Sequence, residues 1–87
     1  MSGRDVHASN DPLAALALPA EVRARALNLL ERIQQAHTAE ELFRASDRAE
    51  GFVMGVETVK ALNPASIEAL YVLFDNAATA RRQEHEQ

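Results

Sequence analysis

Apolar residues recur at helical spacing in three long stretches of the chain, and short polar segments containing proline or asparagine separate these stretches. In the first stretch, steps of three and four residues place one set of side chains on a single face at about 100° per residue: Val22, Ala26, Leu29, Leu30 and Ile33. Pro19 suits the first turn of a helix, and Glu21 complements the positive end of its dipole. The pattern predicts a helix over residues 19–36.

The second stretch has the most regular period in the chain. Its apolar positions alternate in steps of three and four, as expected where helices pack nearly antiparallel: Leu42, Ala45, Ala49, Phe52, Val56 and Val59. Thr38 and Glu41 form the capping-box pattern, in which a hydroxyl and a carboxylate satisfy two amides at a helix start. A helix is therefore predicted over residues 39–62.

The third stretch follows an Asn63-Pro64 pair. The residue before a proline disfavours the α region, whereas the proline fits a first helical turn, so this pair ends one helix and begins the next. One face then carries Ile67, Leu70, Tyr71, Phe74, Ala77 and Ala78, with Leu73 at its edge. The third helix is predicted over residues 64–83, and the fold class is all-α, an antiparallel three-helix bundle.

The N-terminal residues lack such a period. Residues 1–11 are polar and are predicted to form a flexible segment, whereas residues 12–87 form a single helical domain. Asp11 and Pro12 resemble an N-cap followed by a first-turn proline, which predicts one or two helical turns through Leu13 and Leu16.

Composition narrows the classes of function. The 87 residues contain no cysteine, which excludes disulfides and thiolate metal sites. Thirteen acidic residues against nine basic ones give a net charge of −4, and such a field disfavours nucleic acid and anionic membranes. No apolar run is long enough to span a membrane, so a cytoplasmic location is expected. The arginine-rich and alanine-rich composition suggests a bacterial source.

Residues suited to catalysis or metal binding are scattered. His7, His37 and His85 lack the i, i+4 spacing of paired metal ligands, and His37 is expected to continue the apolar face of the first helix. No hydroxyl lies in a nucleophile elbow, and an enzyme using Glu57 or His37 would need a pocket that the sequence does not indicate. We predict a non-enzyme without a metal or cofactor.

Two glycines inside the second predicted helix are unusual. Gly51 and Gly55 should each destabilise the helix by about 1 kcal/mol relative to alanine. Since they are four residues apart, they lie on one flank, where the missing side chains let another backbone approach closely. A close crossing inside the monomer is the simpler interpretation. A crossing between chains is the main alternative, and a ligand pressed against the backbone is the third.

Several large apolar residues fall outside the predicted seams. Phe43, Val53 and Met54 lie opposite or beside the seam of the second helix, and Leu27 and Val72 add to them. If contiguous, they would form a patch large enough to mark an interaction surface. Alternatively, the N-terminal segment folds back and covers the patch with Leu13, Leu16 and Leu18. The predicted interface comprises Phe43, Gly51, Val53, Met54, Gly55 and Val72.

These features predict a non-catalytic protein-interaction module that forms a homodimer through the second helix and part of the third. The alternative is a small helical transcriptional or nucleoid-associated regulator that binds DNA, because short helices joined by tight turns also build helix-turn-helix domains. The charges oppose nucleic acid as a partner, since no uniform basic stripe is present. For example, Arg81 and Arg82 are followed by Glu84 and Glu86.

Overall fold

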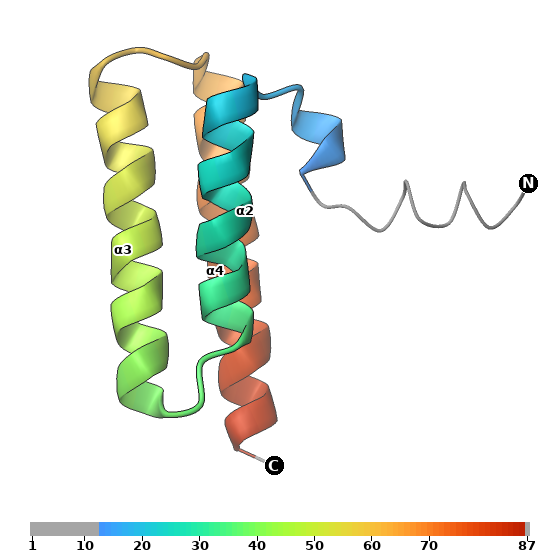
Figure 1. Cartoon of the computed structure of the whole chain (residues 1–87), viewed down its shortest axis with the longest axis vertical. Helices are drawn as coiled ribbons and strands as arrows, with labels where there is room; N and C mark the ends of the chain where they lie inside the picture. The colour runs from blue at the N-terminus through green and yellow to red at the C-terminus, as the bar shows by residue number, and fades with distance from the viewer. Residues whose placement is uncertain (1–12, 87) are drawn as a thin grey trace, which may run out of the picture.

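Three long α-helices lie side by side in a computed structural model that describes residues 13–86 (Figure 1). A short 3-10 helix, η1 (Ala14–Leu16), precedes α2 (Ala20–Gln34), α3 (Ala39–Thr58) and α4 (Pro64–His85). Helix α3 runs antiparallel to α2 and α4. Residues 13–86 contain no strand, which confirms the predicted all-α bundle. The predicted flexible segment, residues 1–11, lies outside the described residues.

The core forms where the apolar faces of the three helices meet. Its buried members are Leu13, Ala26, Leu29, Leu30, Ile33, Ala36, Leu42, Ala49, Val53, Val56, Ile67, Leu70, Phe74 and Ala78. The stripes predicted for α2 and α4 are therefore confirmed in their central members. This burial supplies the main free energy that holds the helices together, because the hydrophobic effect scales with the apolar area removed from water.

The predicted seam of α3 needs two corrections. Val53, which was placed outside the seam, is 0% exposed, whereas Val59, which was placed within it, is 72% exposed. Helix α3 packs against both α2 and α4, so its buried stripe is wider than a single seam and is centred closer to Val53 than predicted. Val59 lies beyond the helix end and cannot share the stripe.

The connection between α2 and α3 contains most of the predicted capping box. The Thr38 Oγ1 accepts a hydrogen bond from the Glu41 amide at 3.0 Å, as expected. The Glu41 carboxylate accepts from the amide of His37 at 2.8 Å, one residue earlier than the pattern predicts. Helix α2 ends at Gln34, and Ala36 takes the buried position that follows it, so His37 is exposed. The prediction that His37 continues the apolar face of this helix was therefore wrong.

The connection between α3 and α4 begins four residues earlier than predicted. Lys60 adopts a left-handed conformation with φ of 57°. The amide of Ala61 donates to the carbonyl of Val56 at 3.1 Å, and the amide of Lys60 donates to the carbonyl of Glu57 at 3.0 Å. These two bonds define a Schellman motif. Glycine or asparagine usually marks this position, so lysine concealed the helix end in the sequence.

Helix α4 starts as predicted. The Asn63 Oδ1 accepts a hydrogen bond from the amide of Ser66 at 2.8 Å, and Pro64 occupies the first turn. The helix ends at His85, two residues beyond the predicted end. The start of α4 is therefore fixed by Asn63 and Pro64, whose roles can be recognised from the sequence.

The segment before α2 packs on the side of the bundle formed by α2 and α4. Leu13 is 1% exposed, and Leu16 and Leu18 pack partly buried against the core. Leu16 lines a hollow together with Leu30 of α2 and Leu73 of α4. The described part of this segment therefore leaves Phe43 and Met54 exposed, so the alternative in which its leucines cover them was wrong.

Candidate functional site

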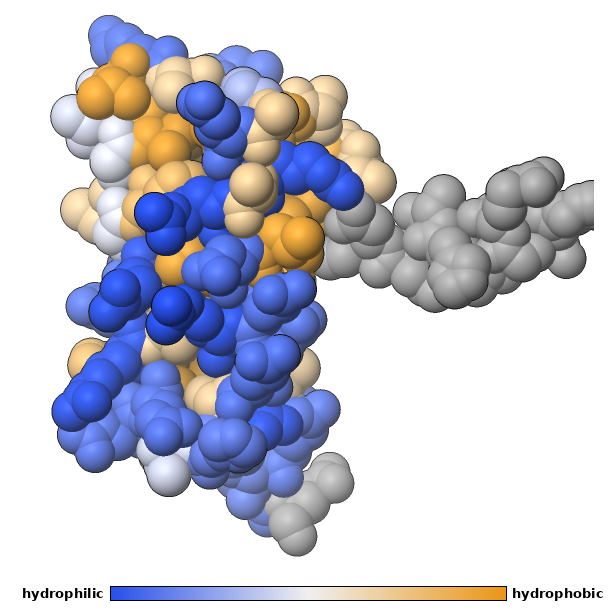
Figure 2. All heavy atoms as spheres, viewed as in Figure 1, coloured by the Kyte–Doolittle hydropathy of each residue, from blue (hydrophilic) through white to orange (hydrophobic). Residues whose placement is uncertain are grey.

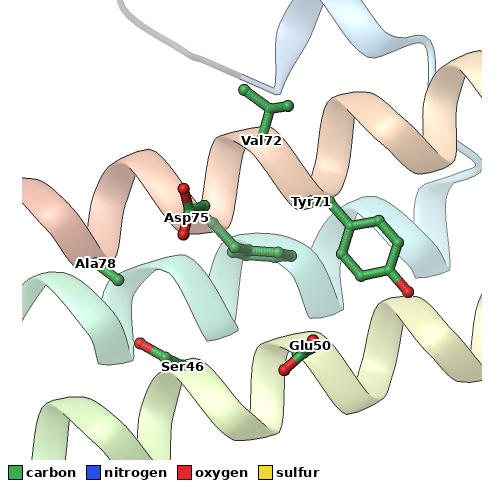
Figure 3. Close-up of a pocket in the computed structure, with 7 residues that line it drawn as sticks. Ser46, Glu50, Tyr71, Val72, Asp75 and Ala78 are labelled. Atoms are coloured by element: carbon green, nitrogen blue, oxygen red, sulfur yellow. The ribbon is translucent and has the colours of Figure 1, made fainter.

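A groove runs along the bundle between α3 and α4. One part is a cavity of about 390 Å³, lined by Ser46, Glu50, Tyr71, Val72, Phe74, Asp75 and Ala78 (Figure 3). A second hollow is lined by Ala39, Leu42, Phe43, Ser46, Asp75, Ala78, Arg82, His85 and Glu86. Because the two share Ser46, Asp75 and Ala78, they form one continuous surface, named here the α3–α4 groove. We call its two ends the Tyr71 end and the Arg82 end.

Helical spacing explains why these side chains gather. On α3, Phe43, Ser46 and Glu50 follow one another in steps of three and four, and therefore lie on one flank beside the buried stripe. On α4, the residues at 71, 75, 78 and 82 do the same. Phe74 and Ala78 are buried and give the groove an apolar floor. Neither α2 nor the described N-terminal segment contributes a lining residue, so the other elements leave this groove open.

A tyrosine and a carboxylate bridge the two helices at the Tyr71 end. The Tyr71 hydroxyl lies 3.3 Å from the Glu57 Oε1, to which it donates a hydrogen bond. Partial burial raises the pKa of Tyr71 above its ordinary value of 10.0, and the negative charges of Glu57 and Glu50 raise it further. Tyr71 is therefore a neutral hydrogen-bond donor at neutral pH, which suits positioning of α3 against α4 better than base or nucleophile chemistry.

Four charged side chains of the groove have no partner within the described part of the chain. Glu50, Asp75, Arg82 and Glu86 make no side-chain hydrogen bond or ion pair within residues 13–86. By contrast, Arg81 next to Arg82 pairs with Glu84 at 2.8 Å. The groove thus presents charges that are available to a binding partner.

The structure brings three of the predicted interface residues to this region. Phe43 is 72% exposed and lines the groove on α3, while Val72 is 50% exposed and lines it on α4. Met54, 53% exposed, lies four residues beyond Glu50 on the same flank of α3. Val53 belongs to the buried core instead, and including it in an interface was wrong. Leu27 lies on α2, away from the groove-lining residues, so the apolar excess does not form one patch.

The two helical glycines do not mark a close crossing inside the monomer. A Cβ atom built on Gly51 or Gly55 meets no other atom within 4 Å. Gly51 is two residues from both Ala49 and Val53, or about 200° round the helix, so it faces away from the core. The simpler sequence interpretation is therefore wrong, and a close approach by another chain stays a prediction.

The remaining chemistry of the described residues is sparse. Within residues 13–86, no group of three or more metal-ligating side chains lies close enough to hold a metal ion. Over the same residues, no helix combines the length and the apolar character needed to cross a membrane. The Nε2 of His85 lies 2.9 Å from the carbonyl oxygen of Ala36 and donates to it, since a carbonyl can only accept.

Comparison with known proteins adds no relative. No protein-family model matches the chain, and no curated protein or solved structure matches it. The class of the protein is thus defined by its fold, the antiparallel three-helix bundle, and by the groove.

The sequence patterns did not indicate the groove, because they describe each helix separately and do not single out Glu50, Asp75 or Arg82. The available signal was the spacing of Phe43, Ser46 and Glu50 in steps of three and four. This spacing places the three residues in a row beside the buried stripe of the same helix. That spacing identifies a flank of α3. It does not reveal that α4 supplies the opposite wall.

Proposed function

We propose that the chain is a non-catalytic interaction module that associates with a second copy of itself through the α3–α4 groove. The observation that carries the proposal is the exposure of two large apolar side chains, Phe43 and Val72, on the two walls of one groove with an apolar floor. Interfaces are built around such apolar anchors, and a polar rim surrounds them.

The size of the chain supports self-association. A small chain buries a modest fraction of its surface, and a second copy would remove further apolar area from water. Met54 extends the apolar surface along α3, and methionine adapts well to contact surfaces because its side chain is flexible. Gly51 and Gly55 leave the outward side of α3 smooth beside it.

The oligomeric state tests the proposal directly. Sedimentation of the wild-type chain at tens of micromolar, a range set by ordinary micromolar affinities, should show a dimer. The Phe43→Glu and Met54→Glu variants should each shift it to monomer and retain the helical circular dichroism signal, because both side chains are exposed. A strictly monomeric wild type would overturn the proposal.

Val59→Glu provides the matched control. Val59 is as exposed as Phe43, 72% in each case, but it lies at the end of α3 and does not line the groove. This variant should stay dimeric. If the wild-type chain is instead monomeric and is retained on duplex DNA in a salt-dependent manner, the alternative of a DNA-binding regulator is favoured.

A further inference from the structure

Charge is distributed unequally along the α3–α4 groove. At the Tyr71 end the carboxylates that line the groove are those of Glu50 and of Asp75, which lies where the two ends meet, and Glu57 lies close by, bonded to Tyr71. The cationic Arg82 lies at the other end together with His85 and Glu86. Among the residues that line it, the groove thus has one acidic end and one end of mixed charge.

This distribution distinguishes the two ways in which a pair of identical grooves can face each other. A closed symmetric dimer places the same patch of both chains in contact about a two-fold axis. An axis parallel to the helices sets the Tyr71 ends together, so that carboxylates face carboxylates, which is unfavourable. An axis perpendicular to the helices sets each Tyr71 end against an Arg82 end. This axis also sets each helix against its own copy, so the guanidinium of Arg82 on α4 meets Asp75 on α4 of the other chain.

We infer that two copies pack antiparallel on the α3–α4 groove, with Arg82 on α4 of each chain facing Asp75 on α4 of the other; this rests on the proposed function. The axis passes near Ser46 and Ala78, which line both halves of the groove. Their small side chains allow the two grooves to approach closely. Phe43, on α3 at the Arg82 end, then lies against α3 of the second chain at its Tyr71 end.

Charge reversal tests the orientation. Asp75→Arg and Arg82→Glu should each weaken self-association by about tenfold or more, since each replaces an attractive pair with like charges at two symmetric places. An equimolar mixture of the two variants should form a heterodimer with affinity near that of the wild type. In that heterodimer the two introduced side chains, of opposite charge, face each other at one place. At the other place the native Asp75 faces the native Arg82, so both pairs attract.

The mixture separates contacts between chains from effects within a chain. It can be followed by native mass spectrometry or by fluorescence anisotropy with one variant labelled. Glu31→Arg on α2, which makes the same charge change on an exposed residue that does not line the groove, should leave the dimer unchanged. Raising the salt concentration should reduce the differences among the variants, because exposed charges are screened.

The association of the two variants, alone and mixed, decides whether the antiparallel pairing is correct. Restored association in the mixture supports the antiparallel pairing. If both single variants dimerise like the wild type, or if the mixture stays as weak as its components, the pairing is overturned. The Phe43→Glu and Met54→Glu results still decide separately whether the groove face mediates self-association.

Discussion

The two helix connections lie at opposite ends of the bundle and are held in different ways. At the α2–α3 connection, residues 35–38, the carbonyl oxygen of Ala36 accepts hydrogen bonds from the Nε of Arg81 at 2.8 Å and from the Nε2 of His85 at 2.9 Å. These bonds join positions 45 and 49 residues apart in sequence. The α2–α3 connection is therefore held against the C-terminal end of α4 by hydrogen bonds within the chain.

The α3–α4 connection, residues 59–63, relies on local geometry. Its Schellman motif places Lys60 in the left-handed region, and Val59 is 72% exposed beside it. On the face shown in Figure 2, hydrophobic residues gather over the half of the bundle near this connection, and hydrophilic residues cover most of the opposite half. The comparison indicates that one end satisfies its polar groups internally, whereas the other retains apolar surface and backbone strain.

The largest expected effect comes from breaking the long-range contact at the α2–α3 end. Arg81→Ala should lower the free energy of unfolding by about 1 to 3 kcal/mol, because it removes a partly buried hydrogen bond from a charged donor. Urea denaturation followed by circular dichroism measures this loss. Arg48→Ala, which removes an exposed arginine from α3, should have a much smaller effect, and equal losses would contradict the role assigned to Arg81.

The N-caps at the two ends should be nearly equivalent. Thr38→Ala and Asn63→Ala should each destabilise the chain by about 1 kcal/mol, since each removes a side-chain acceptor for an amide in a first helical turn. The same denaturation experiment compares them. A difference well above about 1 kcal/mol between the two variants would show that the two N-caps contribute unequally to stability.

Relieving the left-handed residue should stabilise the α3–α4 end. Lys60→Gly is expected to raise the free energy of unfolding by about 0.5 to 1 kcal/mol, because glycine adopts positive φ without the steric penalty of a Cβ atom. The greater conformational freedom of glycine in the unfolded chain offsets part of this stabilisation. Lys60→Ala keeps the penalty and should give no gain. Thermal melts of both variants test the difference, and equal behaviour would contradict it.

The smallest expected effect is a pH dependence at the α2–α3 end. The hydrogen bond from the His37 amide holds the pKa of Glu41 below its ordinary value of 4.5 in the folded chain. The resulting stabilisation is present above the unfolded pKa and is lost as the pH falls through the folded pKa. Glu41→Gln should therefore flatten the decline of stability on the acid side. Identical profiles for variant and wild type would show that the bond contributes nothing.

The local elements of this protein were predictable from the chain alone. The starts of α3 and α4 follow from Thr38 and from Asn63 with Pro64, whose capping contacts reach only three residues along the sequence. The buried faces of α2 and α4 follow from periodicity, because side chains at steps of three and four share a face wherever a helix forms. The antiparallel arrangement follows in addition from the short connections between consecutive helices.

Only the tertiary structure decided how α3 is rotated about its axis and which flank of the bundle stays open. Val53 is buried because α3 contacts two neighbours, and Gly51 faces outward for the same reason. The α3–α4 groove and the bond from Arg81 to Ala36 join residues far apart in sequence. Sequence patterns record the spacing within one helix, whereas such contacts depend on where a second helix lies, and no local interaction fixes that position.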